Sequence, residues 1–212
     1  MMAAQTAVTR GHKVVLFEQN EELGGHLNDI NKLPFKDDLL QYTEWDKRTT
    51  LECGADIRLG TKATPENVAA EEPDAIIMCT GSDLLKPPIP GIDGDNVVSV
   101  IDVDSKRVEV RGENILVCGG GMSGLECALT LAMEGKKVTV IDMIPLKDFG
   151  RGTVNFTINM CNMLLNKYGV KRIGEQRIVE FTDKGAKTMD MQFRDHFFEA
   201  DTFCNSLSCY EE

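Results

Sequence analysis

The chain shows two kinds of hydrophobic pattern. Short apolar runs are typical of strands, and longer stretches with apolar residues at helical spacing are typical of helices. Short strands are predicted at 14–18, 56–59, 115–118, 138–141, 171–173, 177–182, 188–193 and 201–204, and a strand leading to a turn within 72–82. Helices are predicted at 35–52, 64–73, 125–134 and 154–168, the second with Thr64 as its N-cap and Pro65 as its first residue. Strands that alternate with helices favour parallel crossovers, so the chain is predicted to have an α/β fold.

A glycine-rich loop lies between two of these strands. Gly119, Gly121 and Gly124 form the pattern G-x-G-x-x-G directly after the strand at 115–118. The following helix leads to a second strand that ends at Asp142, 23 residues after the first glycine. The glycine pattern alone would be a weak signal, but strand, loop, helix, strand and terminal acid together predict a dinucleotide-binding unit.

Each glycine of this loop has a separate predicted task. Gly119 permits a tight turn, Gly121 lets the backbone approach a pyrophosphate, and Gly124 lets the helix pack closely on the strand. Backbone N–H groups and the positive end of the helix would then hold the phosphates without a basic side chain. The candidate phosphate-binding residues are Gly119, Gly120, Gly121, Met122, Ser123 and Gly124. The alternative is a glycine-rich turn without a ligand.

Asp142 bears on which nicotinamide cofactor is preferred. A carboxylate at the end of the second strand can accept hydrogen bonds from both ribose hydroxyls and would repel a 2′-phosphate. This favours NADH over NADPH, unless Lys147 or Arg151 nearby compensates for the charge.

The beginning of the chain repeats the same plan. A helical pattern leads into the strand at 14–18, and four residues stand 124 positions before their counterparts: Gly11 and Gly135, Lys13 and Lys137, Val14 and Val138, Glu18 and Asp142. Residues 72–82 likewise align on 199–209 with a spacing of 127. Two copies of one plan are therefore predicted, with domains at 1–108 and 109–212 separated after the proline-rich stretch 86–91.

On this spacing the glycine loop of the first copy falls before Met1. We therefore expect the first of the two domains to be incomplete, lacking its first strand and its glycine loop. Glu18 occupies the position of the ribose-binding acid in this copy. From the residues alone, it is either a ribose ligand or a solvated charge at the end of a strand.

Composition and charge exclude several classes of function. The net charge of −11 and the absence of a basic stripe argue against nucleic-acid binding. No apolar run approaches membrane-spanning length, so we expect a cytoplasmic protein without a membrane partner. Neither the seven scattered cysteines nor the three histidines form a metal-ligand cluster or a hydrolytic triad, so no catalytic or metal-binding side chain is predicted. A redox pair at Cys204 and Cys209 is the alternative for "CNSLSC", but nothing nearby lowers a thiol pKa.

Three stretches together resemble a known family. "GHKVVLFEQNEELGGHL", "PDAIIMCTGSDLLKPPIPGIDGDNVVS" and "ENILVCGGGMSGLECALTLAMEGKKVTVID" are similar to the flavoproteins with two dinucleotide-binding domains. The resemblance is strongest to the C-terminal half of the multidomain relatives of old yellow enzyme, which include 2-enoate reductase, 2,4-dienoyl-CoA reductase and trimethylamine dehydrogenase. It implies two Rossmann-like domains, for FAD and for NAD(P), and "LGGHL" favours the enoate-reductase branch.

The resemblance also implies roles for individual residues. Glu18 would bind the adenosine ribose of FAD, and the neighbouring residues Gly24, Gly25, His26 and Leu27 would lie along that cofactor. Thr80 and Gly81 stand where the family's Ala-Thr-Gly motif passes close to FAD, while residues 119–124 and Asp142 would take NADH. No redox cysteine pair follows Gly24 and Gly25, so a disulfide reductase is not expected.

Several departures from the family bear on function. FMN and a 4Fe-4S cluster would belong to an N-terminal flavin barrel that this sequence does not contain, so we expect a fragment. Asn205 and Ser208 replace an apolar residue and a glycine of the family pattern. The predicted function is the FAD- and NADH-binding part of a flavin-dependent oxidoreductase, passing hydride to FAD and electrons onward. The alternative is a non-catalytic NAD-binding module that has lost FAD binding.

Overall fold

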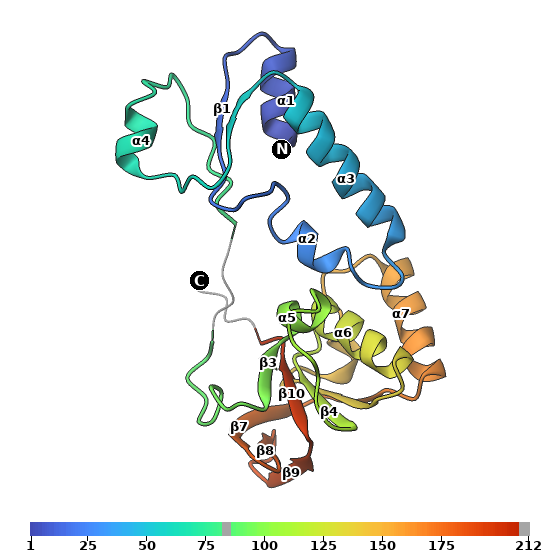
Figure 1. The fold of residues 1–212 in the computed structure, drawn as a ribbon. Helices are drawn as coiled ribbons and strands as arrows, with labels where there is room; N and C mark the ends of the chain where they lie inside the picture. Colours follow the sequence, from blue (N-terminus) through green and yellow to red (C-terminus); the bar gives the residue numbers. More distant parts are fainter. Residues whose placement is uncertain (82–85, 208–212) are drawn as a thin grey trace. The chain divides into compact units, whose positions relative to one another are not determined.

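The chain folds into two compact units, Met1–Asp83 and Leu84–Glu212. The computed structural model describes residues 1–81 and 86–207, and Figure 1 shows the elements of both units. Our expected domain boundary near residue 108 falls inside the second unit. The reason is that β3 (Val97–Ser99) pairs with β10 (Thr202–Asn205) of that unit.

Within residues 1–81, the first unit contains a short parallel sheet and four helices. Its elements are α1 (Met2–Thr9), β1 (Val15–Phe17), α2 (Leu27–Ile30), α3 (Asp37–Glu52), β2 (Asp56–Arg58) and α4 (Pro65–Ala69). Polar side chains join α1 to α3, because Gln5 Nε2 donates to Asp46 Oδ1 at 2.6 Å and to Thr50 Oγ1 at 2.7 Å. Asp46 and Thr50 are buried, so their hydrogen bonds to Gln5 offset the cost of removing polar groups from water.

The predicted cap of α4 is confirmed. Thr64 Oγ1 accepts a hydrogen bond from the Asn67 amide, and Asn67 Oδ1 accepts one from the Thr64 amide, which is a reciprocal capping box. Pro65 occupies the first helical position, where its missing N–H costs nothing. The helix ends at Ala69, four residues before the predicted end.

The strand predicted within 72–82 is absent from the described part of that stretch. Residues 75–80 are coil, and the exposed fractions of Ile76, Ile77 and Met78 are 59%, 68% and 73%. An apolar sequence becomes a strand only when a neighbouring strand satisfies its backbone groups. Among the described residues no strand pairs with this stretch.

The second unit is built on a parallel sheet of five strands. Their order is β3, β10, β4 (Asn114–Cys118), β5 (Lys137–Ile141) and β6 (Lys171–Ile173). The helices of this unit are α5 (Val100–Asp104), α6 (Met122–Met133) and α7 (Asn155–Lys167), with the 3-10 helix η1 (Leu146–Asp148). This alternation confirms the predicted α/β class.

The central strands of this sheet are buried on both faces. Ile115 and Val117 pack in one cluster with Leu125 of α6, whereas Leu116 and Cys118 pack in another with Phe203. Such double burial explains why β4 is a continuous apolar run rather than an alternating one. At the start of β4, Asp201 Oδ2 accepts hydrogen bonds from the Glu113 and Asn114 amides, each at 2.8 Å.

An antiparallel sheet adds three strands, β7 (Gln176–Thr182), β8 (Gly185–Asp190) and β9 (Asp195–Glu199). Phe181 and Ala186 of this sheet join the cluster around Phe203, which packs it on the parallel sheet. The sequence patterns predicted β7 and part of β8 but not β9. None of the helices in residues 1–81 and 86–207 is both long and apolar enough to cross a membrane.

Asp190 organises the turn between β8 and β9. Its Oδ2 lies 2.9 Å from His196 Nε2 and accepts from Arg194 Nε at 2.8 Å, while its Oδ1 accepts from the Gln192 amide at 2.9 Å. These contacts, His196 first, lower the pKa of Asp190 below its usual value. The ionised carboxylate therefore stabilises the folded state above its unfolded pKa of about 3.9, and this contribution is lost as the pH falls through the folded value.

We therefore expect Asp190→Asn to lower the Tm at pH 7 and the difference from wild type to shrink as the pH drops below about 3.9. Thermal unfolding of both proteins from neutral to acidic pH measures this. Asp195→Asn, at the exposed start of β9, is the matched control and should leave the Tm at pH 7 unchanged. A difference at position 190 that stays constant down to the lowest pH would contradict the assignment.

Candidate functional site

The loop after β4 has a tight turn at Gly119 and a close approach of the helix at Gly124. Gly119 has φ +118°, and a Cβ there would lie 2.6 Å from the Ser206 carbonyl oxygen. A Cβ on Gly124 would lie 2.1 Å from the carbonyl oxygen of Gly119, so only glycine lets α6 approach the loop. A Cβ on Gly121 would meet nothing within 4 Å. The fold thus explains the glycines at 119 and 124 but not the one at 121.

The N-terminus of α6 opens onto this loop. Gly121 is the N-cap residue, and no side chain caps the helix there. Met122, Ser123 and Gly124 form its first turn, where backbone N–H groups have no partner within the helix. Their partial positive charge suits an anion such as a phosphate.

Asp142 lies directly beside the loop, at the end of β5. Its Oδ2 accepts a hydrogen bond from the Gly120 amide at 2.6 Å, and its Oδ1 accepts one from the Ile144 amide at 3.2 Å. The structure therefore brings the predicted ribose acid and the predicted phosphate loop together. It also holds the carboxylate in one orientation by bonds at both oxygens.

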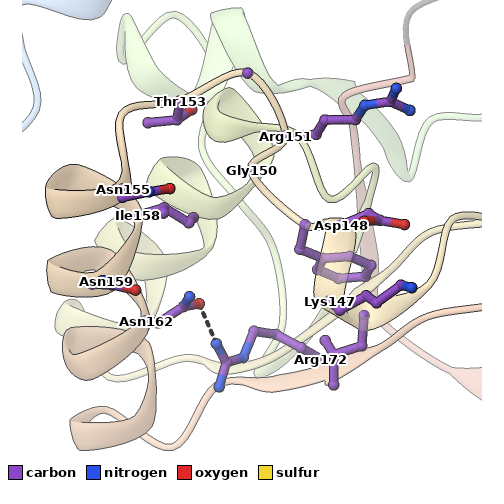
Figure 2. A pocket seen from close by; sticks show the side chains of 13 residues that line it. Lys147, Asp148, Gly150, Arg151, Thr153, Asn155, Ile158, Asn159, Asn162 and Arg172 are labelled. Atoms are coloured by element: carbon purple, nitrogen blue, oxygen red, sulfur yellow. Dashed lines mark hydrogen bonds between the residues drawn. The ribbon is translucent and has the colours of Figure 1, made fainter.

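The second unit also has a polar cavity of about 530 Å³, whose lining side chains are drawn in Figure 2. Its walls are η1, the loop that follows it, and α7, and Arg172 of β6 also lines it. The Gly150 amide donates to the Gly120 carbonyl oxygen at 2.8 Å, and the Phe149 ring leaves no room for a Cβ on Gly120. The wall of the cavity is thus packed against the glycine loop, and Lys147 and Arg151, which sequence reasoning considered, both line it.

Sequence reasoning did not anticipate the contact of residues 149 and 150 with the glycine loop. It joins positions 30 residues apart, and no motif marks it in advance. The signal in the sequence is the pair of glycines at 150 and 152, which is typical of a tightly turned loop, and both have positive φ in the structure.

Glu18 has a local environment that matches that of Asp142. The Asn20 amide donates to Glu18 Oε1 at 2.9 Å, as the Ile144 amide donates to Asp142. The backbone contacts of the two residues are also alike. The Glu18 amide donates to the carbonyl oxygen of Arg58 at the end of β2, and the Asp142 amide donates to that of Ile173 at the end of β6. Asp142 also accepts a hydrogen bond from the Gly120 amide. Glu18 has no such contact here, because with a spacing of 124 this sequence contains no residue that corresponds to Gly120.

The other residues predicted to contact FAD lie in two further segments of the first unit. Gly24 and Gly25 both have positive φ, and a Cβ on Gly24 would meet the Asn28 side-chain amide at 2.6 Å. His26 Nδ1 lies 3.2 Å from Asp29 Oδ2, and Leu27 begins α2. Thr80 and Gly81 are exposed at the end of the coil 75–81.

Two of the cysteines in the described residues are buried in apolar surroundings, Cys118 and Cys161. Burial raises the pKa of the Cys118 and Cys161 thiols, so both are protonated at neutral pH. The predicted alternative of a Cys204–Cys209 pair cannot be placed, because Cys209, like Ser208, lies outside the described residues. Within residues 1–81 and 86–207, no group of three or more histidine, cysteine or acidic side chains is arranged to hold a metal ion.

Residues 1–205 match the family model described as pyridine nucleotide-disulphide oxidoreductase. The chain therefore belongs to this family of oxidoreductases.

Individual relatives confirm the resemblance to the enoate-reductase type. An NADH oxidase of Thermoanaerobacter brockii is 37% identical over 68% of this chain and 23% of its own length. A cinnamate reductase of Clostridium sporogenes is 38% identical over 68% of the chain and 21% of its own length. The solved structure of a 2-naphthoyl-CoA reductase complex covers 95% of the chain with a TM-score of 0.84 at 28% identity, and 30% of that protein is matched. The chain thus spans under a third of each of these proteins.

Proposed function

We propose that the second unit binds NADH at residues 119–124 and Asp142. The observation that carries this proposal is the open space at Gly121, beside the uncapped first turn of α6 and within the loop that also holds Asp142. A structural turn explains why positions 119 and 124 are glycine but gives no reason for a glycine at 121. A pyrophosphate that approaches the backbone does give one.

Each part of this site would do a different job. Amides of the loop and of the first turn of α6 would hold the pyrophosphate, and Asp142 would accept hydrogen bonds from the adenosine ribose. Asp142 is oriented for that task by the Gly120 and Ile144 amides. NADH supplies a hydride when bound, so the residues of this chain have to position the cofactor rather than act as acid or base.

The first unit fits only part of an FAD site. We propose Glu18 as the ligand of the adenosine ribose, supported by the environment it shares with Asp142, and the turn at 24–27 together with Thr80 and Gly81 as further contacts. A phosphate-binding loop beside Glu18 is not among residues 1–81. We therefore assign no step of the reaction to FAD on these 212 residues alone.

The resemblance to cinnamate reductase supports a finer proposal about the reaction in which this chain takes part. We propose an enoate-reductase-like, cytoplasmic oxidoreductase in which hydride passes from NADH to FAD. Electrons would then pass to an FMN and iron–sulfur domain outside this sequence. The chain would serve that protein as its dinucleotide-binding part.

A second candidate is a non-catalytic NAD-binding module, which is favoured because residues 1–81 hold no phosphate-binding loop beside Glu18. Purified protein with added FAD, NADH and an artificial electron acceptor separates the two. NADH oxidation that requires FAD supports the oxidoreductase, whereas tight NADH binding without turnover supports the module. Failure to bind NADH in a folded protein contradicts both.

The proposed role of Asp142 predicts the cofactor preference. We expect Asp142→Asn to weaken NADH binding at least about tenfold, because one charge-assisted hydrogen bond contributes roughly 1.5–3 kcal/mol and 1.4 kcal/mol is tenfold in affinity. NADPH should lose less or gain, since the repulsion of its 2′-phosphate disappears and Lys147 and Arg151 remain nearby. Fluorescence titration with each nucleotide measures both affinities.

Asp183→Asn is the matched control, because it removes one negative charge from the exposed turn between β7 and β8. It should leave both affinities unchanged. A ratio of NADH to NADPH affinity that is the same in Asp142→Asn and wild type would exclude Asp142 as the discriminating residue.

A further inference from the structure

The polar cavity of the second unit has a positively charged lining. Lys147, Arg151 and Arg172 line it, and Asp148 is the one acidic residue among its lining residues. None of these four side chains forms an ion pair with another residue of the described ranges 1–81 and 86–207. The whole chain carries a net charge of −11, so this concentration of cations stands out from the rest of the molecule. A concave site lined mostly by one sign of charge attracts ions of the opposite sign.

Arg172 of β6 is held in one orientation without losing its charge. Its Nη1 donates to Asn162 Oδ1, a bond shown in Figure 2, and its Nη2 donates to Asn166 Oδ1. Both acceptors are neutral amide oxygens, and a guanidinium stays protonated at neutral pH, so the positive charge of Arg172 is not compensated within the part of the chain that the structure describes. The side chain is half-buried, and two of its five N–H donors are used. The remaining donors are available to an anionic ligand.

α7 presents a row of asparagines on the same side as Arg172. Asn155, Asn159, Asn162 and Asn166 follow one another at intervals of four, three and four residues, which places them on one face of the helix. Asparagine is a poor helix former, because its side chain competes for backbone hydrogen bonds, so this row within 13 residues needs an explanation. Asn162 and Asn166 orient Arg172, whereas Asn155 and Asn159 line the cavity and make no side-chain hydrogen bond to any residue that the structure describes. The amide groups of Asn155 and Asn159 are therefore free to bind a ligand.

We propose that this cavity binds the phosphate group of a small polar molecule, with Arg172 and the side-chain amides of Asn155 and Asn159 as ligands. Phosphate fits best because its tetrahedral oxygens can accept hydrogen bonds from several directions at once. The donors here come from α7, from β6, and from η1 and the loop after it, which carry Lys147 and Arg151. A planar carboxylate is satisfied by a single guanidinium and would leave the other donors unused. Pockets of about 300–1,000 Å³ hold whole small molecules, so a cavity of about 530 Å³ accommodates more than the phosphate group itself.

This phosphate site is distinct from the proposed nicotinamide site, although the two are neighbours. Residues 119–124 and Asp142 are all described by the structure, and none of them lines the cavity. The contact between the two sites is made by the cavity wall, where the Gly150 amide donates to the Gly120 carbonyl oxygen at 2.8 Å. The proposal therefore does not rest on NADH binding at the glycine loop.

Calorimetric titration of the 212-residue protein with glycerol 3-phosphate tests the proposal. It is done at constant ionic strength and with saturating NADH, so that the glycine loop is not available to the phosphate. We expect one binding site per chain, and glycerol alone should give no binding. Absence of binding by glycerol 3-phosphate would overturn the proposal. Loss of binding when NADPH replaces NADH would also overturn it, because the cavity would then belong to the 2′-phosphate of that cofactor.

Inorganic phosphate is the second probe, and it separates a free phosphate ion from a phosphorylated molecule. It should bind more weakly than glycerol 3-phosphate, because it fills only part of the cavity. Tighter binding of inorganic phosphate would contradict an organic ligand.

Variants locate the binding in the cavity. Asn159→Asp adds a negative charge to the cavity wall and leaves both bonds of Arg172 in place, so the affinity for glycerol 3-phosphate should fall at least about tenfold. The Tm should change little, because Asn159 is exposed. Arg172→Gln should weaken binding similarly but also lower the Tm, since it removes the contact between β6 and α7.

Gln192→Glu is the matched control, because it makes the same change from amide to acid in the exposed turn between β8 and β9. It should retain the wild-type affinity for glycerol 3-phosphate. Wild-type affinity in Asn159→Asp would overturn the proposal, whether or not the glycine loop binds NADH.

Discussion

Gly121→Val is expected to abolish measurable NADH binding while leaving the fold almost unchanged. A Cβ at this position meets nothing within 4 Å, and the backbone, with φ −68° and ψ 171°, is one that valine adopts readily. The cost to the fold is the poorer N-cap residue, about 1 kcal/mol. The added side chain would occupy the space through which a pyrophosphate reaches the backbone, so affinity should fall at least about a hundredfold, which is roughly 2.8 kcal/mol.

Two measurements on the same sample test this expectation. Titration with NADH gives the affinity, and thermal unfolding gives the Tm. Loss of binding with a Tm within a few degrees of wild type supports a nucleotide site at the loop. Unchanged affinity would leave the glycine loop as a structural turn without a ligand.

The geometry of this loop could be predicted because its determinants are local. The spacing of Gly119, Gly121 and Gly124, with a strand before and a helix after, leaves few conformations for six residues. Asp142 could be placed beside it for the same reason, since parallel neighbouring strands end at the same edge of a sheet. Its bond to the Gly120 amide follows from that topology. That these residues bind NADH stays a prediction.

The internal repeat carried more structural information than any single motif. It identified β1 with β5 from four matching positions, and the structure shows the same register in the β1–β2 and β5–β6 pairs. The shared backbone contacts of Glu18 and Asp142 extend this agreement to the surroundings of the proposed ribose acids. A repeat predicts long-range pairing because one copy is a template for the other.

Predictions that depended on a distant partner were less successful. Residues 75–80 have the composition of a strand, yet they are coil, because pairing decides whether such a sequence becomes a strand. β9 was missed for the opposite reason, since its polar residues Asp195 and His196 conceal a strand that is fixed by its pairing with β8. Local pattern determines which segments are able to form strands, and the availability of a neighbour determines which of them do.

Gly124→Val is expected to destabilise the fold much more than Gly121→Val does. A Cβ at position 124 would lie 2.1 Å from the backbone carbonyl oxygen of Gly119, and because the backbone fixes the position of a Cβ, no side-chain rotation relieves the contact. The helix has to move away from the loop, and overpacking of this kind costs about 3 kcal/mol. Replacing a helical glycine by valine returns only about 0.4 kcal/mol of helix propensity, so the steric cost dominates.

The Tm of Gly124→Val should therefore fall by roughly 10 °C, and NADH binding should be lost with it. Each variant adds the same side chain to the same loop. Thermal unfolding of the two side by side therefore separates the proposed role of Gly121, access for a pyrophosphate, from that of Gly124, close packing of the helix. α6 packs against β4, β5 and α7, so moving it disturbs the core of the second unit, whereas a side chain at 121 disturbs only the space above the loop. If Gly124→Val were as stable as wild type, the close approach of α6 to Gly119 would not be what requires a glycine at this position.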